Sequence, residues 1–132
     1  MAGSGILVHA ALTCDGRDAW APPHAADAAI ATGFRAHQGI DKGFGPALGH
    51  DATLVLGAAL ARAGYEVGQA QSPWHLVPGD RALIRKLAAG TAAAATESGH
   101  VDAATAQDWS RHRAEAEACA IGHLDLLATP RE

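Results

Sequence analysis

The sequence predicts an α/β fold, in which strands and helices alternate along a chain of 132 residues. Short apolar or alternating segments lie at residues 5–12, 65–70 and 120–128, and this pattern is typical of strands. Segments with apolar residues at helical spacing separate them, two before the second strand and two after it. The expected order is therefore strand, helix, helix, strand, helix, helix, strand.

The first strand is predicted from a nearly continuous apolar run over residues 5–12, interrupted by His9. Such a run is typical of a strand that is buried on both faces of a sheet. Asp15-Gly16 is a tight-turn signal, so we expect a sharp turn or a small hairpin that reaches Trp20. Pro22-Pro23 then ends any extended pairing, because proline has no N–H to donate.

Two helices are expected before the second strand. The first runs from His24 to about His37, with Phe34 as its large apolar anchor. Residues 38–50 are rich in glycine and predict a loop. Asp51 belongs to the residue types that cap helices, and it predicts the start of a second helix that continues through Ala63.

The second half of the chain repeats this alternation. Residues 65–70 alternate as in a strand, and residues 72–76 continue it after a proline break. Asp80 predicts the start of a helix that the alanine-rich tract 91–96 prolongs.

Asp102 predicts the start of the last helix, which runs through about Ala118 with Trp109 on its buried side. The apolar segment 120–128 closes the chain as a third strand, and Pro130 ends it.

Composition excludes several classes of protein. The hydrophobic share is 48%, but 33 of the residues are alanine, so we expect a core of alanine and leucine buried mainly by helices. With 14 acidic and 10 basic residues the net charge is −4, which argues against a nucleic-acid partner. No apolar stretch approaches the roughly 20 residues that a membrane helix needs, so no membrane partner is expected.

Cys14 and Cys119 lie far apart and form no CxxC motif. They are interpreted as reduced core cysteines of a cytoplasmic protein, with a disulfide between them as the open alternative. Residues 1–5 carry no positive charge and are interpreted as an artificial or disordered start. The domain is expected to span residues 6–130.

Five segments share their order and spacing with a known family: Leu12-Thr-Cys-Asp-Gly-Arg17, Asp41-Lys-Gly-Phe-Gly-Pro-Ala-Leu-Gly49, Ala63-Gly-Tyr-Glu-Val67, Ser72-Pro-Trp74 and Gly122-His-Leu-Asp-Leu-Leu127. They resemble the C-terminal half of a class I S-adenosylmethionine-dependent methyltransferase, over about Ile6 to Pro130. The resemblance implies part of a Rossmann-like sheet, strands five to seven with the last one antiparallel, and flanking helices.

The same resemblance implies methyl transfer to a small-molecule acceptor, with this chain as the substrate-side half. The family's glycine-rich loop follows its first strand, and no strand, glycine loop and helix precede Ile6. The glycines of residues 41–49 follow a helix and a polar segment, so they are interpreted as a substrate-side loop or a structural turn. We therefore expect the intact enzyme to use S-adenosylmethionine and this chain alone to bind it weakly or not at all.

Expected partners are a small-molecule acceptor and a complementing N-terminal half or a second copy of the chain. One alternative is a non-catalytic methyltransferase-like module that pairs with another subunit. Another is a small-ligand-binding α/β domain unrelated to methyl transfer.

Seven residues are predicted to contact the substrate. Four polar residues gather where the first helix becomes the loop, namely His37, Gln38, Asp41 and Lys42. Three aromatic residues lie in loops or at strand ends and are suited to line an acceptor pocket, namely Trp20, Phe44 and Trp74. The alternatives are helix-end capping for the polar group and packing over the sheet edge for the aromatic group.

No catalytic residue is assigned, and His37 is the first candidate to test as a base. His123 and Asp125 lie two apart on the closing strand, either as a base with its orienting carboxylate or as a polar strand face. The eight histidines form no motif with metal-ligand spacing, so no metal site is predicted.

Overall fold

The computed structural model describes residues 5–11 and 13–131, so the predictions for residues 1–4 and for Leu12 lie outside it. Six strands are present in this part: β1 (Val8–Ala10), β2 (Ala19–Ala21), β3 (Tyr65–Gln71), β4 (Trp74–Leu76), β5 (Ala118–Ile121) and β6 (Leu124–Pro130). Four α-helices accompany them: α1 (Asp27–Gln38), α2 (Ala52–Arg62), α3 (Arg81–Glu97) and α4 (Ala103–Arg113). Short 3-10 turns at Gly49–Asp51 and Pro78–Asp80 lead into α2 and α3.

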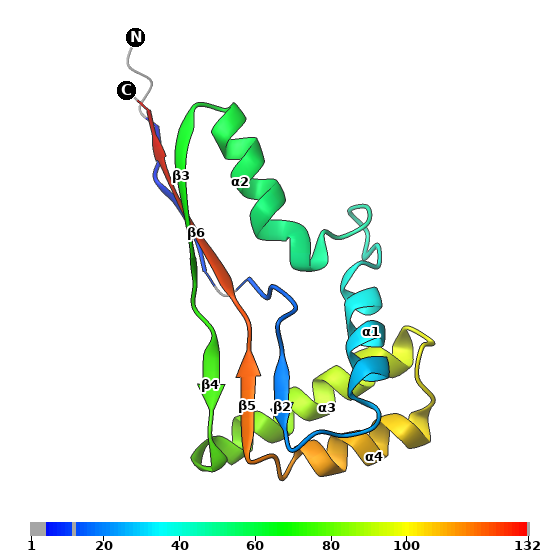
Figure 1. Cartoon of the computed structure of the whole chain (residues 1–132). Coiled ribbons are helices and arrows are strands. Elements are labelled where there is room, and N and C mark those ends of the chain that lie inside the picture. The colour runs from blue at the N-terminus through cyan, green and yellow to red at the C-terminus, as the bar shows by residue number, and fades with distance from the viewer. Residues whose placement is uncertain (1–4, 12, 132) are drawn as a thin grey trace.

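The strands form two antiparallel sheets, in the orders β1-β6-β3 and β2-β5-β4. Each sheet has its central strand antiparallel to both neighbours. The chain passes along the molecule three times, first through β1 and β2, then through β3 and β4, and last through β5 and β6 (Figure 1). The two sheets therefore lie end to end along the same three passes.

Backbone hydrogen bonds continue across the junction between the two sheets. Cys14 and His123 form an antiparallel bridge, and the Ser72 amide donates to the His123 carbonyl at 3.0 Å. Pro73 has no N–H for a ladder, and Gly122 and His123 separate β5 from β6. These interruptions explain why three passes give six short strands.

The α/β class and the four helices are confirmed, while the first strand differs from the prediction. It covers only Val8–Ala10 and is not buried on both faces, since Ile6 is 76% and Leu7 56% exposed. The reason is that β1 is an edge strand. Within residues 5–11 and 13–131 it pairs with β6 alone. The segment after the turn forms β2, which pairs with β5 and not with β1 as a hairpin would.

Three boundaries are corrected as well. The first helix begins at Asp27 instead of His24, because the Asp27 side chain accepts the His24 amide and closes a turn there. The last helix ends at Arg113 instead of about Ala118, where β5 begins. The closing strand is two strands, β5 and β6, and it extends to Pro130.

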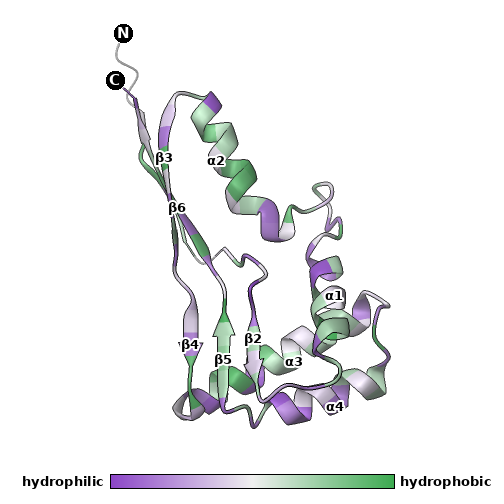
Figure 2. Cartoon of the chain, in the orientation of Figure 1, coloured by the Kyte–Doolittle hydropathy of each residue, from purple (hydrophilic) through white to green (hydrophobic). Residues whose placement is uncertain are grey.

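Helix α2 lies against one face of the β1-β6-β3 sheet (Figure 1). A Cβ on Gly57 would lie 2.8 Å from Nε2 of Gln69 and 3.3 Å from Cδ1 of Leu126, so glycine permits this close approach. The Thr53 hydroxyl donates to the Leu124 carbonyl at 2.9 Å. The outer side of α2 remains apolar and exposed, including Leu54 at 55% (Figure 2).

The other three helices pack together beside the β2-β5-β4 sheet. Their core is rich in alanine as predicted, with Ala88 and Ala95 fully buried. Its large side chains are Ile30 and Trp109, each 1% exposed, so Ile30 anchors α1 more deeply than the half-buried Phe34. No helix in the described part of the chain is long and apolar enough to cross a membrane.

The exposed edge at β1 predicts self-association, because an unpaired strand edge with apolar side chains is a template for pairing. Sedimentation velocity should show the chain associating as its concentration rises. Leu7→Lys should weaken this association, whereas Leu83→Lys on α3 should leave it unchanged. A monomer at every concentration would contradict the expectation.

Candidate functional site

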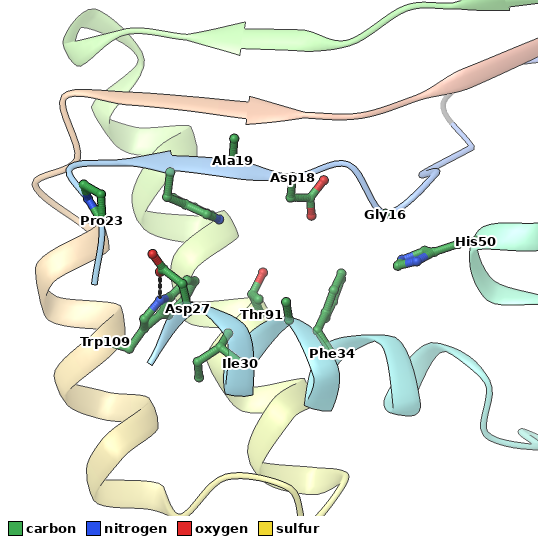
Figure 3. A pocket seen from close by; sticks show the side chains of 12 residues that line it. Gly16, Asp18, Ala19, Pro23, Asp27, Ile30, Phe34, His50, Thr91 and Trp109 are labelled. Carbon is green, nitrogen blue, oxygen red and sulfur yellow. Dashed lines mark hydrogen bonds between the residues drawn. The ribbon is translucent and has the colours of Figure 1, made fainter. Parts of the chain in front are cut away.

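A cavity of about 300 Å³ lies between β2 and the helices α1, α3 and α4 (Figure 3). Its apolar lining includes three aromatic side chains and one aliphatic one, namely Trp20, Phe34, Trp109 and Ile30. Its polar lining comes from Asp18, Asp27, His50 and Thr91. This combination of an apolar surface with a few polar groups is typical of ligand sites.

A wider groove between α3 and α4 offers less chemistry. Its volume is about 450 Å³, and most of its lining is alanine, glutamine and serine or threonine. Glu97 is the carboxylate there, and it is paired with His37 at 2.8 Å. The cavity beside β2 is therefore the stronger candidate.

The inner end of the cavity is organised by Asp27, the first residue of α1. One carboxylate oxygen accepts hydrogen bonds from Nε1 of Trp109 at 2.8 Å and from Nη2 of Arg113 at 2.6 Å. The other oxygen accepts the His24 amide at 2.9 Å. Burial alone would raise the pKa of Asp27, but these hydrogen bonds lower it on balance, so the carboxylate is ionised and both of its oxygens accept hydrogen bonds.

Arg113 is the buried member of this cluster, with 1% of its surface exposed. Besides Asp27 it binds the Pro22 carbonyl, and its guanidinium lies 5.8 Å from the centre of the Trp109 ring. Trp109 in turn contacts Trp20 edge to face, with ring centroids 5.3 Å apart. The ion pair thus positions two aromatic side chains of the cavity.

Asp18 and His50 lie at the other end of the cavity (Figure 3). Asp18 precedes β2, and its carboxylate accepts the Gly122 amide at 3.2 Å. The residue as a whole is exposed, yet burial of the carboxyl group raises the pKa of Asp18, and the nearby Asp15 raises it further. Across residues 5–11 and 13–131, no lysine, arginine or histidine forms an ion pair with Asp18.

His50 is neutral in this environment. Burial and the neighbouring Arg35 lower the pKa of its imidazole, and Nε of Arg35 donates to Nδ1 at 3.1 Å. The proton is therefore assigned to Nε2, which is buried without a hydrogen-bond partner in the described structure. Gly16 has φ of +83°, and a Cβ there would overlap the imidazole, so glycine is needed beside this ring.

Of the seven predicted substrate residues, the cavity lining contains Trp20. His37 is engaged by Glu97, and Lys42 donates to the His37 carbonyl at 3.5 Å. Asp41 accepts the amides of Gly43 and Gly45 at 2.8 and 2.9 Å. These local contacts at the end of α1 fit the alternative of helix-end capping.

The other three predicted residues also lie outside the cavity lining. Phe44 is fully exposed in the loop. The Trp74 ring lies 4.8 Å from the His123 ring, at the junction of the two sheets. Oε1 of Gln38 is buried without a partner among the described residues.

Sequence reasoning missed most residues of the cavity. Asp27 lies more than 80 positions before Trp109 and Arg113, its two partners on α4, and no local pattern links it to them. The spacing of Asp18 and Trp20 did indicate that both could line one cavity, because residues two apart on an extended segment share one face.

His24, Asp108 and His112 form a cluster whose potential ligand atoms lie within 4.8 Å of one another. Nδ1 of His24 accepts the Ala26 amide at 3.1 Å, which assigns the proton to Nε2. Nε2 lies 3.4 Å from the Asp108 carboxylate and faces it as a donor, so this ring presents no lone pair to a cation there. Asp108 is also paired with Arg111 at 3.0 Å. We therefore interpret the cluster as a network of ion pairs.

Both cysteines are free, as predicted. Burial raises the pKa of Cys119 to about 12 and also raises that of Cys14. Sγ of Cys14 lies 3.8 Å from Nε2 of the buried His123. A raised pKa lowers the fraction of reactive thiolate, so we assign no catalytic role to this pair.

Comparison with protein-family models, curated proteins and solved structures gave no match to this chain.

The Asp27 cluster yields a stability prediction. Asp27→Ala leaves the Arg113 cation buried without its carboxylate, which should lower the free energy of unfolding by about 3 kcal/mol. Urea denaturation measures this loss. The control is Glu115→Ala, which removes an exposed carboxylate paired with Arg81 and Arg85 and should cost less than about 1 kcal/mol. Equal losses in the two variants would show that the buried pair has no special role.

Proposed function

We propose that this chain is the substrate-side half of a class I S-adenosylmethionine-dependent methyltransferase, and that the cavity beside β2 holds its small-molecule acceptor. The observation that carries the proposal is the direction of the closing strand. The resemblance implies that the last strand of the sheet is antiparallel. In this chain, β6 runs antiparallel to both β1 and β3. The helices between the strands also follow the expected order.

The position of the cavity supports an acceptor site. In open α/β sheets, ligands bind outside the carboxyl ends of the strands. The passes β1–β2 and β3–β4 run in the same direction, because β1 and β3 are both antiparallel to β6. The cavity lies along β2, where the first of these passes ends and the chain turns into α1 (Figure 3).

The cofactor does not fit the glycine-rich loop of this chain. A cofactor loop needs free backbone amides, whereas those of Gly43 and Gly45 are held by the Asp41 side chain. The loop also follows helix α1 instead of a strand. We therefore assign to this chain only the acceptor side of the reaction.

On the acceptor side, the residues of the cavity would orient the substrate and exclude water. Alignment of two reactants is a large part of catalysis in a one-step displacement. Trp20 and Trp109 form a fixed aromatic contact, and the Asp27–Arg113 pair holds Trp109 in place. Among the described residues, Asp18 is the carboxylate of the lining without an ion-pair partner, and it replaces His37 as the first proton acceptor to test.

The alternative is a non-catalytic module that pairs with another subunit. It is favoured by the apolar surface that the described chain leaves open, at Leu7 just before β1 and at Leu54 on α2. The two functions differ in what the coding sequence immediately upstream encodes. A strand, a DxGxG loop and a helix there would indicate an enzyme, and their absence would favour the module.

The prediction for this function concerns cofactor binding. Calorimetry should detect no micromolar binding of S-adenosylmethionine to the chain alone. The longer polypeptide that includes an upstream strand, glycine loop and helix should bind the cofactor and transfer its labelled methyl group to a small molecule. Micromolar binding by the chain alone, or a longer polypeptide that neither binds nor transfers, would contradict the proposal.

A further inference from the structure

The charges that line the cavity do not balance. Two carboxylates line it, and within the described residues no lysine or arginine does. Asp27 is neutralised by Arg113 at 2.6 Å, so its charge is satisfied inside the protein. Asp18 has a hydrogen bond from the Gly122 amide but forms no ion pair within the part of the chain that the structure describes, since Arg17 is bound to Asp15 and His50 is neutral.

The Asp18 carboxylate faces an aromatic environment. Asp18 and Trp20 are two residues apart on an extended segment and share a side. Figure 3 shows Asp18 reaching from the segment just before β2 toward α1, with Phe34 opposite and Trp109 at the inner end of the same cavity. The faces of such rings attract cations, and Trp109 already has the Arg113 guanidinium 5.8 Å from its ring centre.

We propose that the cavity binds a small organic ammonium ion, with the cationic nitrogen at the Asp18 carboxylate and the apolar body against Trp20, Phe34 and Trp109. The claim that this ammonium ion is the methyl acceptor rests on the proposed function, whereas the claim that it binds in the cavity does not. A volume of about 300 Å³ limits the ligand to a small molecule. Ligand pockets in general measure about 300–1,000 Å³, so this cavity is at the small end.

Other ligand classes satisfy these groups less well. An anion would meet the unpaired charge of Asp18 in a partly apolar cavity, which is unfavourable. A neutral apolar molecule would cover the same carboxylate and leave it without a partner. A cation with an apolar body satisfies both the carboxylate and the rings.

The test compares three probes of nearly the same shape: phenethylammonium, 2-phenylethanol and 3-phenylpropionate. Calorimetry on the whole chain should show the ammonium ion binding at least about tenfold more tightly than the alcohol, as expected for one charge-assisted hydrogen bond. The propionate should bind more weakly still. Equal affinity for the three probes, or a preference for the anion, would overturn the proposal.

Two variants locate the site. Asp18→Asn keeps an oxygen for the Gly122 amide but removes the charge, and it should abolish the preference for the ammonium ion. Glu66→Gln removes an exposed carboxylate on β3, outside the cavity, and should keep the preference. A preference that survives in Asp18→Asn would overturn the proposal.

Should circular dichroism show that Asp18→Asn is unfolded, Phe34→Leu replaces it as the test. This change keeps an apolar side chain at the cavity but removes one aromatic face, so the preference for the ammonium ion over the alcohol should fall. An unchanged preference in this variant would contradict the assigned site.

The outcome separates this inference from the proposed function. A chain that prefers the ammonium ion, combined with a longer polypeptide that transfers no methyl group, would leave the binding site intact and refute the methyltransferase. Methyl transfer to a hydroxyl or thiol acceptor, combined with no preference for the ammonium ion, would refute this inference alone.

Discussion

The ion pair between Asp27 and the buried Arg113 is the interaction on which the helical half of this protein depends. Arg113 ends α4 and is 1% exposed, so its charge requires a partner inside the protein. That partner begins α1, and the same guanidinium binds the Pro22 carbonyl just after β2. The pair therefore ties two helices and one strand pass together at a single point. Trp109 shares the Asp27 carboxylate and contacts Trp20, which packs against both core clusters of the helical half. The candidate cavity is a consequence of this arrangement.

Much of the fold followed from local patterns in the sequence. Asp102 was predicted to cap the last helix, and its side chain accepts the Thr105 amide at 2.9 Å. Asp51 and Asp80 mark the starts of α2 and α3 as expected, but their side chains make no capping bond to those helices. The strands were harder to predict, because strand boundaries depend on pairing between distant segments. Gly122 lies within an apolar run that reads as one strand, and only the pairing shows that the run divides there.

The candidate site was less predictable than the fold for the same reason. Polar residues that are neighbours in the chain, such as His37 and Asp41, are predicted to bind the substrate because a local cluster is visible in the sequence. In the structure they bind Glu97 and the loop amides, and they lie apart from the cavity lining. The cavity combines β2, the helices α1, α3 and α4 and the turn before α2, and these segments meet only through tertiary packing. Trp20 does line the cavity, and its position in the sequence indicates this because an aromatic side chain in a loop or at a strand end is suited to line a pocket.

The most direct test of this account follows the indole N–H resonances of the three tryptophans while phenethylammonium is added to the chain. Trp20 and Trp109 line the cavity, whereas Trp74 lies outside its lining, with its ring tilted against that of His123. With the resonances assigned by single Trp→Phe substitutions, we expect those of Trp20 and Trp109 to shift together and that of Trp74 to stay in place. A titration that moves Trp74, or that leaves Trp20 and Trp109 unchanged, would contradict the claim that the Asp27–Arg113 pair builds a ligand site.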